Sequence, residues 1–301
     1  MKDAFKMLIC VGSCMFLLPI FIVYLTDTPV GVSHKETRQI EERQEEKDII
    51  NEKTLIGILA KEVPYTYELE ALKAQAVVER TYMARRILGI QKQGAIVGYT
   101  EEEMKVLWGE ESYQRIYNKY KEAVDATRGK IIVYNNQPIE ALYHKSSSGR
   151  TRDGESVYKQ EIPYLKSVES SVDVITDQVK WNKEEVVRKI KEKYPDLVAE
   201  AEYLESQIQI VSKDQAGYVD AIQVGNITLT GEEFKNMLGL PSCAFKIYHS
   251  GEELIFDVKG SGTGIGLSQN GANELAKQGM LYEDIIKHYY TDISIEDYEV
   301  Q

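Results

Sequence analysis

One carboxyl group and two cations stand close together in the stretch AKEVPYTYELEALKAQAVVERTY. Glu62 comes directly before a proline break, and Lys73 and Arg80 follow on the next segment. These two cations are seven residues apart, so at 100° per residue they lie on one helical face within about 20° of each other. Gln75 lies about 200° around the helix from Lys73, so a cavity facing the cations hardly sees it. An acid beside cations suits catalysis, although such residues are more often simply solvated.

A loop rich in serine and glycine follows a predicted strand in ALYHKSSSGRTRDGESVY. Its backbone N–H groups and hydroxyls suit a polar ligand, although loops of this composition are common. His144 is a candidate general base or metal ligand. Because no cysteine or second histidine stands nearby, a partly buried strand histidine is the favoured interpretation.

Alternate glycines mark the stretch DVKGSGTGIGLSQNGANELAKQG, at Gly260, Gly262, Gly264 and Gly266. In a strand, period two puts all four on one face, which another backbone or a ligand can approach closely. The run is not a phosphate-binding loop, because Ile265 and Leu267 stand where G-x-G-x-x-G needs glycine. Ser268 is not in a G-x-S-x-G elbow either, since Asn270 occupies the last position.

The elements that must position these residues mix helices and strands. Pro64 ends a short amphipathic segment, and apolar residues at helical spacing then predict a helix over roughly 67–88. A further helix is predicted over 111–127, followed by a hairpin in GKIIVYNNQPIEALYHKS with its turn at Asn-Asn-Gln-Pro. The charged middle, about 170–207, is predicted to be a helical scaffold.

From Ile208 the pattern returns to short strands in IQIVSKD, VDAIQVG, ITLTG, FKIYHS and LIFDVKG. Helices are predicted at GEEFKNMLG, NELAKQG and YEDIIKHYY. No repeat and no regular βαβ rhythm is visible. The prediction is therefore an α+β fold of mixed helices and short antiparallel strands, in one lobe or in two lobes with a central cleft.

The composition describes a globular chain of 301 residues, with 43% hydrophobic and 28% charged residues. Its net charge of -12 comes without any basic stripe, which argues against a nucleic-acid partner. Cys10 and Cys14 lie in the apolar N-terminus and Cys243 stands alone, so no disulfide is expected within the folded body.

The N-terminus carries an uncharged apolar run over residues 7–25, long enough at 1.5 Å per residue to cross a hydrocarbon core of about 30 Å. Lys2 and Lys6 precede it, so the positive-inside rule places residues 1–6 in the cytoplasm. A cleaved signal peptide is the alternative, but the run exceeds a typical apolar core of such peptides and no A-x-A-like site follows it.

Residues 26–51 are densely charged and are predicted to form a solvated stalk. Residues 52–301 are then predicted to form the globular domain. The expected location is the cell membrane, with a single span and the globular domain on the extracytoplasmic side.

Seven motifs, in this order, resemble the catalytic domain of the SpoIID/LytB family, which contains stage II sporulation protein D and the amidase enhancers. They run from about Thr54 to Tyr290. They are EVP at Glu62, LKAQAVVERTY at Leu72, SSSGRT at Ser146, PYLKSV at Pro163, TGEEF at Thr230, LGLPS at Leu238 and GTGIGLSQNGA at Gly262.

The resemblance implies a lytic transglycosylase of sporulation, active in engulfment, that cuts the bond between N-acetylmuramic acid and N-acetylglucosamine in peptide-stripped glycan strands. It implies that Glu62 is the catalytic acid, with the sugar's own C6 hydroxyl as nucleophile, which gives a 1,6-anhydro product without water. To hold its proton at neutral pH, Glu62 would need a raised pKa. Burial near Pro64 would supply it, whereas Lys73 or Arg80 close by would lower the pKa. The resemblance also implies substrate-binding roles for Lys73, Arg80, Tyr143, Ser146, Ser148, Ser268 and Gln269.

The chain departs from the family in its last motif, where Thr263, Ile265, Leu267 and Asn270 replace the frequent His, Val, Met and Tyr. Some members bind zinc through His and Cys near the second motif. This chain offers only His144 there, so no cofactor and no tight zinc site are expected. The implied partners are peptidoglycan glycan strands, an amidase or endopeptidase that strips stem peptides, and other sporulation membrane proteins.

Two other functions remain open from the sequence. One is a non-catalytic peptidoglycan-binding enhancer of a partner amidase, which the altered glycine motif favours and the retained Glu62, Lys73 and Arg80 disfavour. The other is a structural scaffold at the membrane, which would bind without turnover or activation.

Overall fold

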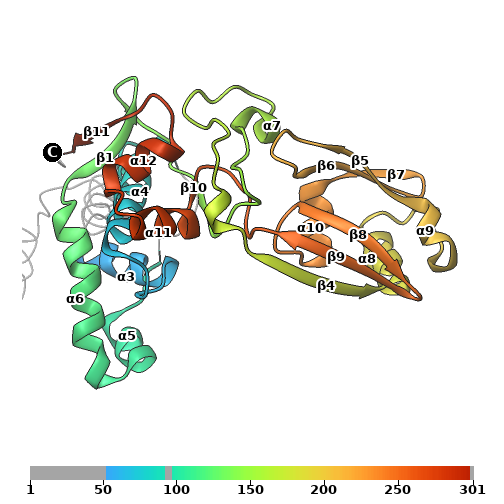
Figure 1. The fold of residues 1–301 in the computed structure, drawn as a ribbon, viewed down its shortest axis with the longest axis horizontal. Helices are drawn as coiled ribbons and strands as arrows, with labels where there is room; N and C mark the ends of the chain where they lie inside the picture. The colour runs from blue at the N-terminus through green and yellow to red at the C-terminus, as the bar shows by residue number, and fades with distance from the viewer. Residues whose placement is uncertain (1–51, 92–96, 299–301) are drawn as a thin grey trace, which may run out of the picture. The chain divides into compact units, whose positions relative to one another are not determined.

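The computed structural model describes residues 52–91 and 97–298, which mix helices with short strands as predicted (Figure 1). The predicted α+β class is therefore confirmed. Within these residues no helix is both long and apolar enough to cross a membrane. The predicted tail, span and stalk lie outside the described residues, and the predicted domain boundaries, two lobes and central cleft stay predictions.

Helix α4 (Leu69–Ile87) is the element around which the first part of the fold packs, against α3 (Glu52–Glu62) and α6 (Glu110–Ala126) among others (Figure 1). Helix α3 ends two residues before Pro64, as predicted, and α4 and α6 fit the predicted ranges to within two residues. The sequence analysis did not predict α5 (Glu101–Trp108), which begins at a capping box formed by Thr100 and Glu103.

Strands β1 (Lys130–Tyr134) and β2 (Gln137–Pro138) form the predicted hairpin. Its turn residues Asn135 and Asn136 have φ of 51° and 60°, the left-handed conformation that asparagine tolerates. The C-terminal strand β11 (Ser294–Asp297) pairs with the other edge of β1.

Strand β3 (Tyr143–His144) follows the hairpin in the chain and pairs in parallel with β10 (Leu267–Ser268). Helices α11 (Gln269–Lys277) and α12 (Tyr282–Tyr289) follow β10 directly and pack against α4. The pairing of β3 with β10 therefore brings the second and third motifs of the sequence together.

The segment from 176 to 258 has its own hydrophobic cluster, to which Val186, Ile222, Phe234 and Phe256 belong. One antiparallel sheet has the order β4-β9-β8 and the other β5-β6-β7. Their bounds are β4 (Thr176–Asn182), β5 (Ile208–Lys213), β6 (Val219–Val224), β7 (Ile227–Thr230), β8 (Ala244–Ser250) and β9 (Glu253–Lys259). Helices α8 (Lys183–Lys193), α9 (Leu204–Gln207) and α10 (Gly231–Leu238) complete this part, and the short helix α7 (Gly154–Tyr158) precedes it in the chain.

The prediction of a purely helical middle is wrong for β4, although α8 lies where a helix was predicted. Only Val179 and Trp181 of β4 pack against the hydrophobic cluster, and the remaining side chains are polar. Two apolar residues give too weak an alternation to reveal a strand from the sequence alone.

The glycine run is not a strand, and that prediction is also wrong. Gly260, Gly262, Gly264 and Gly266 all have φ between 71° and 100°. The predicted close approach of another backbone is confirmed, because a Cβ on Gly266 would lie 1.9 Å from the carbonyl oxygen of Leu142. Glycine there lets the chain reach β10 while touching the segment that leads into β3.

Candidate functional site

Glu62 is the last residue of α3, and its exposed side chain lines a cavity of about 460 Å³. The cavity is lined by Ile58, Lys61, Glu62, Glu79, Tyr82, Val97 and Tyr143. The expected burial of Glu62 near Pro64 is wrong, because its side chain is exposed at the end of the helix, although the next residue, Val63, is buried in the core.

A second carboxyl group, Glu79, lines the same cavity from α4 and is only 5% exposed. Burial raises the pKa of Glu79 to about 7, and the nearby charge of Glu62 adds to this increase. Hydrogen bonds from Gln75, whose Nε2 donates to Glu79 Oε1 at 2.8 Å, and from Tyr143 act in the opposite direction. Glu79 therefore holds its proton to a much higher pH than an ordinary glutamate does.

Tyr143 lines the same cavity as these two acids. Burial raises the pKa of Tyr143, and the nearby charges of Glu79 and Glu62 raise it further. The phenol thus stays protonated. Its position in β3 is fixed by the register that pairs Tyr143 with Leu267 of β10.

Gln269 reaches the same place from the last motif, because its Nε2 donates to the backbone carbonyl of Glu62 at 3.3 Å. Carbonyl groups in the last turn of a helix lack partners within the helix, so this bond satisfies one of them and ties α11 to the end of α3. Ser268 lies at the N-cap of α11, where its Oγ accepts from the N–H of Gly271 at 3.2 Å. Ser268 is fully buried and positions α11 rather than lining the cavity.

Arg80 does not meet Glu62. Its side chain is 2% exposed and forms an ion pair with Glu52 at 3.0 Å. It also donates to the carbonyl oxygens of Val124 and Lys130, at 3.2 and 3.3 Å. The guanidinium therefore joins α3, α6 and β1, and it is not available to a ligand.

Lys73 does not line the cavity either. It pairs with Glu70 at 2.6 Å, and Glu70 in turn accepts from the backbone N–H of Tyr282. The face of α4 that meets the cavity carries Glu79 and Tyr82, opposite to the face chosen in the sequence analysis.

The serines of the second motif lie elsewhere in the fold. Ser146 is buried and bridges to Ser261, and its Oγ accepts from the N–H of Ile175 at 3.3 Å. Ser148 donates to the carbonyl oxygen of Ala216 at 3.2 Å. Neither lines the cavity at Glu62.

His144 is buried in β3, as the favoured interpretation predicted, with Nδ1 3.0 Å from the carbonyl oxygen of Ile265. Among residues 52–91 and 97–298, no three His, Cys, Asp or Glu side chains come together as a metal-binding group. The absence of a tight zinc site stays a prediction.

The sequence analysis missed Glu79, although a signal for it was present. From Ala71 to Arg80 every residue except Lys73 is buried, because α4 is packed on nearly all sides. A helix that is small and apolar around most of its circumference, as in ALKAQAVVE, is expected to be buried on all faces. An acid in such a segment must then face a partner or a cavity.

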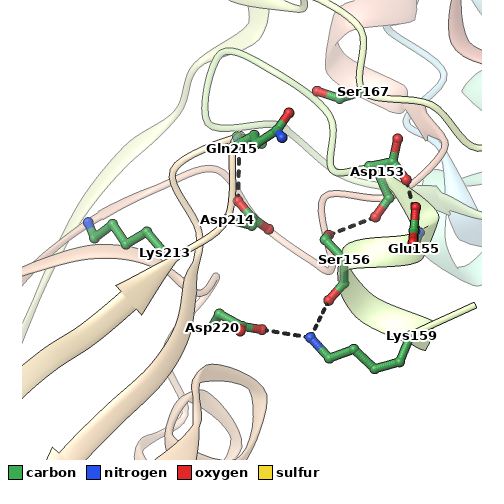
Figure 2. Close-up of a pocket in the computed structure, with 10 residues that line it drawn as sticks. Asp153, Glu155, Ser156, Lys159, Ser167, Lys213, Asp214, Gln215 and Asp220 are labelled. Carbon is green, nitrogen blue, oxygen red and sulfur yellow. Dashed lines mark hydrogen bonds and ion pairs between the residues drawn. The ribbon is translucent and has the colours of Figure 1, made fainter.

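A second cavity, of about 410 Å³, lies between α7 and the β5–β6 hairpin (Figure 2). Three of its carboxylates have partners. Asp214 pairs with the buried Arg152 at 2.7 Å, Asp220 pairs with Lys159 at 3.2 Å, and Asp153 caps α7 through the N–H of Glu155. The two ion pairs connect the segment around α7 to the hairpin, and the cap holds the start of α7.

Comparison with known proteins follows the same motifs. The family model described as stage II sporulation protein matches residues 41–134. Stage II sporulation protein D of Bacillus subtilis (strain 168) is 34% identical over 266 residues, which cover 84% of this chain and 76% of the relative. Its counterpart from Bacillus amyloliquefaciens is 31% identical over 285 residues, covering 91% and 80%.

The amidase enhancer of Bacillus subtilis (strain 168) is 26% identical over 295 residues, covering 81% of this chain and 40% of that protein. The chain is thus a SpoIID-type protein, as the resemblance of its motifs predicted. On the identity and coverage of the two Bacillus relatives, it belongs to the stage II sporulation protein D family.

Proposed function

We propose that this chain is a lytic transglycosylase that cuts the bond between N-acetylmuramic acid and N-acetylglucosamine in peptide-stripped glycan strands. The observation that supports it is the exposed carboxyl group of Glu62 at a cavity that also holds Glu79 and Tyr143. A general acid must be both accessible to the leaving oxygen and supplied with a proton near neutral pH. Glu62 provides the access, and the neighbouring groups provide the proton-holding environment.

The two carboxyl groups of this cavity differ too much in exposure to act as an ordinary glycosidase pair. Such a pair needs a second carboxylate that reaches either the sugar or an attacking water. Glu79 is 5% exposed and already binds Gln75. One accessible acid together with the substrate's own C6 hydroxyl fits this arrangement better than two accessible acids.

The proposed reaction uses Glu62 twice. Its carboxyl proton passes to the O4 atom of N-acetylglucosamine as the bond from C1 of N-acetylmuramic acid to O4 breaks. The C6 hydroxyl oxygen then bonds to C1, and its proton returns to the Glu62 carboxylate. Protons and charge balance without water, and the product carries a 1,6-anhydro ring.

Tyr143 and Gln269 are proposed to support this step, since Tyr143 lines the cavity and Gln269 holds the end of α3. Substrate binding by Ser146, Ser148 and Ser268 has no support from the cavity at Glu62. For Lys73 and Arg80 we propose structural roles in place of the substrate-binding roles that the resemblance implied, because both are held in ion pairs.

We further propose that residues 7–25 anchor the chain in the cell membrane, with the catalytic domain on the extracytoplasmic side. Peptide-stripped strands are the substrate, so an amidase or endopeptidase must act on the wall first. The likeness to a protein named amidase enhancer favours one alternative, a non-catalytic enhancer of such an enzyme.

The test is to incubate the soluble fragment from Asn51 onward with purified peptide-free glycan strands and to analyse the products by mass spectrometry. Glu62→Gln is the test variant, and Glu68→Gln is the matched control, since Glu68 is exposed nearby but does not line the cavity. We expect 1,6-anhydro-muramyl products from the wild type and from Glu68→Gln, and at least a hundredfold less from Glu62→Gln. Strands that all three proteins bind but leave uncut would refute the enzyme and favour the enhancer.

A further inference from the structure

We infer that Glu79 is a positioning residue for the proposed reaction: through the Tyr143 hydroxyl it keeps a proton available to Glu62. The inference rests on the proposed function and adds to it the source of the catalytic proton. It treats Glu62, Tyr143 and Glu79 as one unit, referred to below as the proton-sharing group.

The geometry of this group runs from solvent to the interior. Glu62 ends α3 and is exposed, Tyr143 is half-buried in β3, and Glu79 is buried in α4. All three line the same cavity, where the charges of both carboxyl groups raise the pKa of the phenol. The inferred route for a proton between the two acids is a single exchange at the Tyr143 hydroxyl.

Burial keeps a proton on this group near neutral pH, because it raises the pKa of Glu79 to about 7. The nearby charge of Glu62 adds a smaller repulsion that acts in the same direction, since two carboxylates in one cavity resist being ionised together. Glu62 itself is exposed.

The other titratable groups facing Glu79 do not offset this repulsion. Tyr82 lines the cavity, and Tyr290, which follows α12, lies close enough for the charge of Glu79 to raise its pKa. Neither of these tyrosines brings a positive charge to Glu79. Lys61 is the cation among the described lining residues, and its Nζ donates to the carbonyl oxygen of Val97 at 3.1 Å.

The proposed proton transfer from Glu79 to Glu62 conserves both protons and charge. When Glu62 is ionised, the Tyr143 hydroxyl gives its proton to the Glu62 carboxylate and takes the proton of Glu79. Glu62 then enters the reaction as an acid and Glu79 as a carboxylate, and the net charge of the group is unchanged. After Glu62 regains a proton from the C6 hydroxyl, the same exchange can run backwards.

The experiment measures kcat and KM for glycan cleavage between pH 4.5 and 8.5 with the full chain in mild detergent. The test variants are Glu79→Gln and Tyr143→Phe. The matched control is Glu70→Gln, which removes a carboxyl group from the other side of α4, where Glu70 pairs with Lys73. Circular dichroism of each protein checks its fold at every pH.

In the wild type we expect kcat to fall as the pH rises through about 7, when the proton-sharing group loses its last proton. In Glu79→Gln the fall moves to lower pH, so that kcat is reduced about tenfold or more at pH 7 but within about threefold at pH 4.5. A carboxyl group with the ordinary glutamate pKa of about 4.3 is protonated on only about one molecule in 500 at pH 7. Tyr143→Phe shifts the profile in the same direction, and KM stays unchanged.

A reduction by the same factor at every pH would overturn the inference, since a purely structural role predicts it. A wild-type profile in either folded variant would overturn it as well. Absence of anhydro products from the wild type at every pH is a different result, because it refutes the proposed function and the inference with it. If Glu79→Gln does not fold, the profile of Tyr143→Phe decides between these outcomes.

Discussion

The burial of Glu79 predicts a pH-dependent stability that can be measured without any substrate. Its pKa is raised from 4.5 to about 7 in the folded chain, so the folded state binds this proton more tightly than the unfolded state does. The corresponding contribution to stability is fully present below about pH 4.5 and is lost as the pH rises through about 7. At about 1.4 kcal/mol per unit of pKa difference, the whole contribution is about 3 kcal/mol, most of which is lost between pH 5 and pH 8.

Glu79→Gln removes the titrating group while keeping an oxygen that can accept from Gln75. We therefore expect the free energy of unfolding of the variant, relative to the wild type, to rise by about 2 to 3 kcal/mol between pH 5 and pH 8. The assay is equilibrium unfolding in urea of the fragment from Asn51 onward, followed by circular dichroism, with equal denaturant slopes required at both pH values. Glu68→Gln measures the pH dependence common to an exposed substitution of this kind.

Equal differences between Glu79→Gln and the wild type at pH 5 and pH 8 would refute the reasoning. Such a result would mean that Glu79 is ionised in the folded state throughout this range. The cavity would then have to solvate the carboxylate far better than its burial indicates. The proton-sharing group would lose its physical basis, while the assignment of Glu62 as the acid would still stand.

Two further substitutions test the packing that supports the site. Arg80→Met should lower the free energy of unfolding in urea by about 3 kcal/mol, because it leaves the partly buried Glu52 carboxylate unpaired. A loss below about 1 kcal/mol would show that the ion pair does not hold α3. Gly266→Ala should lower the free energy of unfolding by more than about 3 kcal/mol, since the new Cβ would lie 1.9 Å from the carbonyl oxygen of Leu142. Gly89→Ala is the control, because Gly89 has a similar φ but open space around it, and it should lower the free energy of unfolding by only about 1 kcal/mol. Equal losses for the two glycines would show that backbone strain alone, and not the close approach, fixes Gly266.

Local signals in the sequence were sufficient for most elements of the fold. The apolar spacing of α4, the proline after α3 and the Asn-Asn turn are all interactions between near neighbours, so the chain itself specifies them. The glycine run was harder, because alternation with larger residues is typical of a strand and says nothing about the sign of φ. Only the contact of Gly266 with Leu142, far away in the sequence, explains why glycine is needed there.

The candidate site was predicted only in part for the same reason. Glu62, Tyr143 and Gln269 were singled out by the resemblance, and the structure brings them together through the pairing of β3 with β10. The predicted cavity-facing side of α4 was wrong, because Glu79 and Tyr82, and not Lys73 and Arg80, line the cavity. Lys73 and Arg80 are charged residues that find their partners in Glu70 and Glu52, and helical spacing alone cannot reveal those pairs.

The position of Glu79 also bears on why the fold carries a buried acid at all. A neutral residue in its place would remove a destabilising contribution of about 3 kcal/mol above pH 7. Packing around α4 compensates for it, since this helix contacts α3, α6, α11, α12 and β1 along its length. A stable helix with one destabilising acid aimed at a cavity is the arrangement expected where function, rather than folding, selects the residue. The same acid therefore should weaken folding and sustain catalysis over the same pH range, and the unfolding and cleavage profiles of Glu79→Gln should change together.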